Sequence, residues 1–72
     1  MRLVSDIVGL REVVLGVVDS GALFPVGIGV VNGEGVVVRE LVYQFPRLVN
    51  PVNGKSAVFM PGMEEVVLEA IA

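Results

Sequence analysis

Apolar side chains recur every three or four positions in the first part of the chain, as one face of a helix requires. The spacing predicts a helix over residues 5–19, with Ser5 as its N-cap, Asp6 in its first turn and Gly21 beyond its end. Four β-branched valines in the same stretch favour a strand instead, so the pattern leaves both structures open. The apolar positions of the helical face are Leu3, Ile7, Leu10, Val14 and Val18.

This stretch is apolar almost all round the helix that it would form. Such a helix is buried on several sides, and in so short a chain we expect a second subunit to supply part of that cover. Gly9 and Gly16 lie seven residues apart and share one stripe, where a neighbouring backbone could approach closely.

Two runs rich in β-branched residues, 26–31 and 36–43, flank the sequence Asn32-Gly33-Glu34-Gly35. Asn-Gly supplies the positive φ angles of tight hairpin turns, so the pattern predicts a β-hairpin. Both faces of the second run are apolar, which is typical of a strand covered on both sides. We expect Val36, Val38 and Val42 on one face, and Val37, Leu41 and Tyr43 on the other.

A weaker hairpin follows, in which residues 48–49 and 57–60 flank a turn at Asn53-Gly54. Pro46 and Pro51 limit these strands to short or edge positions. A break at Pro61-Gly62 precedes a short helix over residues 63–71. The sequence therefore predicts one α+β domain over residues 1–72, with an N-terminal helix, central β-hairpins and a short C-terminal helix, completed by packing between subunits.

The composition shows that the chain has more apolar residues than an ordinary domain. The chain is 54% hydrophobic and 18% charged, and 18 of its 72 residues are Val. An ordinary domain is about 45–50% apolar even with Gly counted, and about 25% charged. A domain of this size buries only about 60% of its unfolded surface, and large exposed apolar patches mark interaction surfaces. We therefore expect an obligate oligomer or polymer.

A lipid bilayer does not fit as the cover for this surface. The longest uncharged stretch, residues 20–33, has 14 residues and contains Pro25 and four glycines, whereas a spanning helix needs about 20 apolar residues. Asp6 follows Arg2 closely, which does not suit a signal peptide. We expect no membrane span.

The residue types for most catalytic chemistry are missing, because the chain has no Cys, His, Trp or Thr. We expect no catalytic, cofactor or metal site and no enzymatic activity. Gly54-Lys55-Ser56 matches the end of a phosphate-binding loop, but Val49 stands where its first glycine belongs, which favours a hairpin turn with an exposed lysine. Glu64 and Glu65 diverge on a helix, so we expect them to stabilise its first turn rather than to form an acid pair.

The basic residues are few and unevenly placed. Residues 41–63 hold Arg47 and Lys55 with no acidic residue, whereas the segments on either side are net acidic. These two are either solubilising loop charges or, repeated along a helical array, a basic lining for nucleic acid. Arg11 lies among apolar residues at helical spacing. It either snorkels, pairs with an acid such as Glu12 of a neighbouring subunit, or projects onto a bound phosphate.

Arg outnumbers Lys four to one, Cys is absent and Val is abundant, which indicates a hyperthermophilic host. In size, hydrophobicity, Val and Arg bias and lack of catalytic residues, the chain resembles the major coat protein of rod-shaped, bacilliform double-stranded DNA viruses of hyperthermophilic archaea. The resemblance implies a helical capsid around DNA, with the acidic residues Glu64, Glu65 and Glu69 turned away from it. The phosphate contacts that it implies are Arg39, Arg47, Lys55 and Arg11.

We therefore expect a structural, self-assembling subunit, namely a viral major capsid protein of the virion that forms a helical shell through extended hydrophobic interfaces. Its expected partners are further copies of itself and double-stranded DNA. The alternative is a small cytoplasmic interaction or regulatory domain that forms a closed homo-oligomer through its Val-rich faces.

Overall fold

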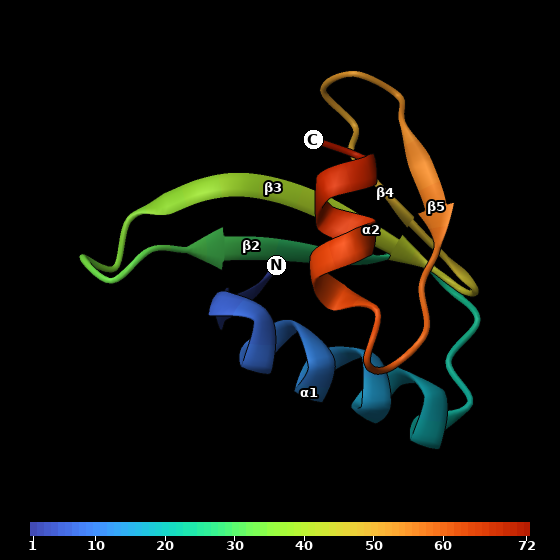
Figure 1. The fold of residues 1–72 in the computed structure, drawn as a ribbon. Coiled ribbons are helices and arrows are strands. Elements are labelled where there is room, and N and C mark those ends of the chain that lie inside the picture. Colours follow the sequence, from blue (N-terminus) through green and yellow to red (C-terminus); the bar gives the residue numbers. More distant parts are fainter.

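The computed structural model describes the backbone of residues 1–72 and every side chain except that of Asp6, so the expected effect of Asp6 on the first helix lies outside it. The fold is α+β, as predicted, with both helices and the hairpins in the expected order (Figure 1). The elements are β1 (Arg2–Ser5), α1 (Asp6–Ser20), β2 (Val26–Val31), β3 (Val37–Gln44), β4 (Arg47–Val49), β5 (Ser56–Val58) and α2 (Glu64–Ala70).

The five strands form one sheet in the order β1-β2-β3-β4-β5. Strand β1 is parallel to β2 and connected to it through α1, whereas the remaining pairs are antiparallel. Strand β3 is the longest and lies at the centre, and the tip of the β2–β3 hairpin projects away from the helices (Figure 1).

The hydrophobic core lies between the helices and one face of the sheet, which we call the helix-covered face. Register places Val4 beside Val30, Ile28 beside Leu41, and Tyr43 beside Leu48, so these buried residues share that face. Tyr43 also meets Phe59 edge-on, with ring centroids 6.2 Å apart. Both helices contribute to the same core, through Leu10, Val14, Val17, Val67, Leu68 and Ile71.

Residues 6–20 are helical rather than extended, which settles the choice that the sequence left open. Leu10, Val14 and Val17 recur at helical spacing and are buried. Burying each such side chain stabilises the fold by about 1.5–3 kcal/mol, which exceeds the helix-propensity cost of a valine, at most about 0.7 kcal/mol. Gly21 ends the helix with φ 70°, and its N–H bonds to the carbonyl of Val18.

Three details of the predicted first helix are wrong. Val18, which was predicted on the apolar helical face, is 45% exposed, and Val17 is buried instead. Leu3 belongs to β1 and not to the helical face, because residues 2–5 pair with β2. Ser5 stands at the N-cap position, but its side chain makes no capping hydrogen bond. Strand β1 was not predicted. It has only four residues and leads directly into a helix, so it is too short to show the alternation of apolar and polar residues that predicts a strand.

The first hairpin forms where Asn32-Gly33 predicts it, but by a different turn. The residue with positive φ is Gly35, at 80°. The side-chain carbonyl of Asn32 accepts hydrogen bonds from the N–H groups of Glu34 and Val36, at 2.8 and 3.2 Å. Asn32 therefore organises the turn through its side chain, and Gly35 supplies the left-handed residue.

A β-bulge changes the faces of β3 from those predicted. The register shifts between Val30 and Val31, which pair with Arg39 and Val37 respectively, so Val38 is the extra residue. Val37 consequently lies on the face opposite to Leu41 and Tyr43, and not with them. Alternation in the sequence alone cannot reveal a bulge, since one inserted residue exchanges the faces on its far side.

The second hairpin and the closing helix follow the prediction with small shifts. Gly54 supplies the positive φ of the β4–β5 turn, at 74°. The N–H of Asn50 bonds to the carbonyl of Lys55 at 2.8 Å and closes this loop.

Gly9 and Gly16 differ in their surroundings, and this difference can be tested. A Cβ on Gly9 would lie 3.1 Å from the Cβ of Val4, whereas one on Gly16 would meet only Arg2 Nη1, at 4.0 Å. We expect Gly16→Ala to raise the free energy of unfolding by about 0.8–1.0 kcal/mol, the helix-propensity difference. Gly9→Ala should gain less, because its methyl group must displace β1. Chemical denaturation at one fixed protein concentration measures both, and equal gains would contradict the close helix–strand contact.

Candidate functional site

The four basic residues expected to contact phosphate do not form one patch. Arg47 lies on the sheet face opposite the helices, which we call the open sheet face. It pairs in register with Gln44 of β3 and Val58 of β5. Its Nε donates a hydrogen bond to Ser56 Oγ at 3.2 Å, which holds the side chain over the neighbouring strand.

Lys55 lies in the β4–β5 loop and contacts the C-terminal end of α2. Its Nζ donates to the carbonyl of Ala72 at 3.4 Å. Asn50 donates to the carbonyl of Ile71 at 2.9 Å, and Asn53 donates to that of Ala72 at 3.3 Å. The last carbonyls of a helix lack partners within it and carry partial negative charge, so amide and ammonium donors stabilise them. Sequence reasoning took the two asparagines for turn formers only and missed this contact.

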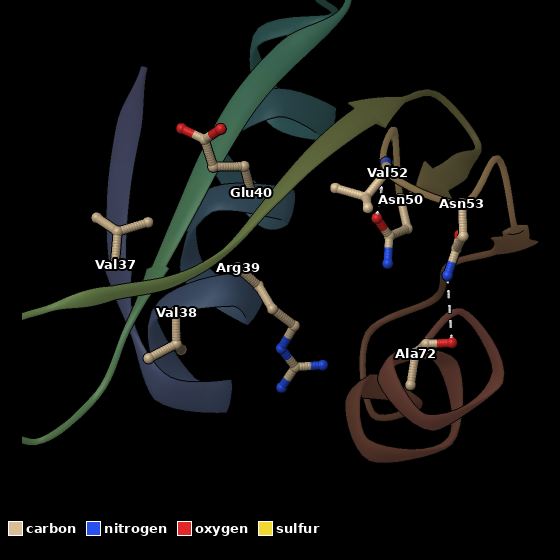
Figure 2. A pocket seen from close by; sticks show the side chains of 8 residues that line it. All are labelled: Val37, Val38, Arg39, Glu40, Asn50, Val52, Asn53 and Ala72. Carbon is tan, nitrogen blue, oxygen red and sulfur yellow. Dashed lines mark hydrogen bonds between the residues drawn. The ribbon is translucent and has the colours of Figure 1, made fainter.

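Arg39 lines a cavity of about 890 Å³ that we call the β3 notch (Figure 2). The notch exists because β4 pairs only with Val42, Tyr43 and Gln44, which leaves the earlier part of β3 without a neighbour on that side. Figure 2 shows Arg39 and Val38 on the α2 side of the strand, with Glu40 pointing away from them. The notch is lined by Val37, Val38, Arg39, Glu40, Asn50, Val52, Asn53 and Ala72.

Two of the four basic residues are each related to Ala72. Arg39 lines the β3 notch together with Ala72, and Lys55 is hydrogen-bonded to Ala72. Arg39 also lines a smaller cavity, of about 330 Å³, together with Glu65 and Glu69 of α2. A ligand of Arg39 therefore has acidic neighbours on one side and amide donors on the other.

Arg11 is exposed on α1 and lies near Glu64 of α2. Glu64 is buried, and its Oε1 accepts a hydrogen bond from the Gly62 N–H at 2.9 Å. This bond, and then the N–H of Glu64 itself, hold the pKa of the carboxyl below its ordinary value of 4.5. Burial opposes the shift, and the charge of Arg11 adds to it. Whether Arg11 snorkels, pairs with an acid of a neighbouring subunit or contacts phosphate stays a prediction.

The Gly-rich segments lie in strands and turns. Gly27 and Gly29 lie within β2, and no helix directly follows them, although a glycine-rich phosphate-binding loop requires one. Gly54-Lys55-Ser56 leads into strand β5, so a phosphate-binding loop is excluded there. Glu64 and Glu65 do not act together, since the first is turned inward and the second lines a separate cavity.

Exposed apolar side chains gather on two opposite sides of the molecule. The helix-side surface comprises Val8, Leu15 and Val18 of α1 and Val66 of α2, of which Val8 and Val66 are 66% and 61% exposed. On α1, these positions are spaced so that they form one outward stripe. The open sheet face, set by the register, carries Leu3, Gly27, Gly29, Val31, Val37, Glu40, Val42, Gln44, Arg47, Val49, Ser56 and Val58.

Neither helix of the described chain has the length and apolar character to cross a bilayer. Comparison of the chain with protein-family models, with curated proteins and with solved structures gives no match.

The lowered pKa of Glu64 predicts how stability depends on pH. The folded state binds this proton less readily than the unfolded state, so the stabilisation is present above about pH 4.5 and is lost as the pH falls through the folded pKa. We expect Glu64→Gln to lower stability at neutral pH and to flatten the loss on acidification.

Urea unfolding across the acid range measures this effect. Glu65→Gln, which removes an exposed carboxylate from the same turn, is the matched control. If both variants show the same pH dependence, the role assigned to the Glu64–Gly62 hydrogen bond is wrong.

Proposed function

We propose that this protein is a structural subunit that assembles with copies of itself. The observation that carries the proposal is the presence of two uncovered apolar surfaces on opposite sides of a two-layer fold, the helix-side surface and the open sheet face. Sixteen large apolar side chains are exposed among the described residues, and seven of them lie on these two surfaces. Exposed apolar side chains that lie together mark sites of association.

Two separate surfaces favour a polymer over a closed dimer. A two-fold contact covers the same surface on both partners, so it leaves the other surface exposed at both ends of the dimer. A second contact through that surface joins dimers to one another and continues without limit. A closed homo-oligomer, the alternative function, would have to bury both surfaces within one small ring.

The specific form that we propose is the coat protein of a virion, arranged as a helical shell. Small size, the many exposed valines and the absence of catalytic residue types support it, together with the resemblance in composition to the coat proteins of rod-shaped archaeal viruses. Double-stranded DNA is the proposed partner. Arg39 and Lys55 are the favoured phosphate contacts, because Arg39 lines the β3 notch together with Ala72, and Lys55 is hydrogen-bonded to Ala72.

Association can be tested by sedimentation velocity at micromolar concentration. We expect the wild-type chain to form species much larger than a dimer. Val8→Lys combined with Val18→Lys should leave the fold intact, since both side chains are exposed, and should stop assembly at the dimer. A stable, folded wild-type monomer would refute the proposed function.

DNA contact is a separate prediction with its own variants. Arg39→Ala combined with Lys55→Ala should weaken retention of double-stranded DNA and reduce the steepness of its salt dependence, by about one unit of slope for each phosphate that is no longer neutralised. Arg2→Ala with Arg11→Ala removes the same charge elsewhere and serves as the control. If both double variants release DNA with the same salt dependence, Arg39 and Lys55 are not the residues that contact DNA.

A further inference from the structure

The open sheet face is apolar at its centre and charged at two ends. Val42 and Val49 pair in register and form a central row, with Gly27 on the other side of Val42. Glu40 lies two residues from Val42 in one direction along β3. Arg47 pairs with Gln44, two residues from Val42 in the other direction. The acid and the base are therefore each about 7 Å from the central row, on opposite sides of it.

Gly27 continues this row without adding a side chain to it. A Cβ built on Gly27 would meet no atom within 4 Å, and its φ lies outside the left-handed region. Gly29, by contrast, is covered by the side chains of Leu3 and Met1. The surface of the sheet at Gly27 is therefore open.

This distribution of charge is complementary to itself. Two copies of the face can be related by a two-fold axis that lies between the two sheets. The axis runs across the strands, parallel to the Val42–Val49 row and directly above it. That rotation exchanges the two ends of the face, so each Glu40 comes opposite the Arg47 of the other copy, offset by one strand spacing of about 4.8 Å. The long side chains of Glu and Arg span such an offset. The strands of the two sheets then run nearly parallel or antiparallel, as in aligned sheet packing.

We propose that the open sheet faces of two copies pack together in this arrangement, with Val42 and Val49 of each copy facing their own equivalents across the axis and two Glu40–Arg47 ion pairs closing the ends. The inference rests on the proposed self-assembly and identifies one of its two interfaces. Ser56 supports the arrangement, because its hydrogen bond holds Arg47 over the sheet. A second copy is favoured over a different partner because acid and base are placed symmetrically about the apolar row.

The arrangement assigns Arg47 a role different from the one that the sequence suggests. An Arg47 that pairs with Glu40 of a second copy lies inside an interface and does not reach a phosphate. Nucleic-acid contact then falls to Arg39 and Lys55, on the other side of the subunit.

Charge reversal with rescue tests the ion pairs. Glu40→Arg and Arg47→Glu each place like charges opposite one another, and we expect each to raise the concentration at which half the protein is associated by at least about tenfold. The double variant restores opposite charges in exchanged positions and keeps the wild-type net charge, so its association should return to near the wild-type value. Glu34→Arg, in the exposed hairpin turn, is the control that matches Glu40→Arg in net charge.

Gly27→Lys tests the apolar row independently. The folded subunit tolerates the added side chain, because the site is open and lies in a strand, but the two-fold arrangement places the two added charges opposite one another. Circular dichroism should show an unchanged fold, and sedimentation equilibrium should show weaker association.

The outcomes separate this inference from the proposed function. If the wild-type chain associates, and the single reversals and Gly27→Lys associate equally well, the sheet interface is wrong and self-assembly stands. A double reversal that is no better than the single ones also overturns it. If the wild-type chain is a monomer at every concentration, both proposals fail.

Discussion

The alternation of side chains in a sheet is the constraint on which the rest of this structure depends. Successive residues of a strand point to opposite faces, and 72 residues provide only two helices, both packed against one face. Leu41, Tyr43 and Leu48 are buried because the helices cover them, whereas Val42 and Val49 alternate with them, lie on the other face and are only half-buried. Neither helix packs against this second face, which is the surface that the proposed self-association would cover.

Local signals in the sequence were sufficient for most of the fold. The bounds of β2 agree with the predicted run, and the turns at Asn32 and Gly54 lie where short-range chemistry places them. Strand β1 was missed because it exists only through pairing with residues more than twenty positions away. The bulge at Val38 was missed for the same reason. A strand that is apolar on both faces gives no signal when one inserted residue exchanges those faces.

The candidate site was harder to predict than the fold, because proximity in sequence differs from proximity in space. Arg47 and Lys55 lie in one basic segment of the chain, yet one faces the open side of the sheet and the other contacts the end of α2. Arg39 and Lys55 are distant in sequence, but Arg39 lines the same cavity as Ala72, to which Lys55 is hydrogen-bonded. Glu64 shows a different limit, since its first-turn position was predicted correctly but its hydrogen bond with the N–H of Gly62, two residues before it, was not.

The edges of the sheet decide what form association takes. Strand β1 has four residues and β5 has three, so each edge offers few unpaired backbone groups. The unpaired stretch of β3 is interrupted by the bulge and carries Arg39 and Glu40. Short, charged and bulged edges are the devices by which proteins prevent strands of different molecules from joining. A chain this rich in valine would otherwise be prone to cross-β fibres. In the proposed assembly, such edges would leave the faces of the sheet as the surfaces available for contact.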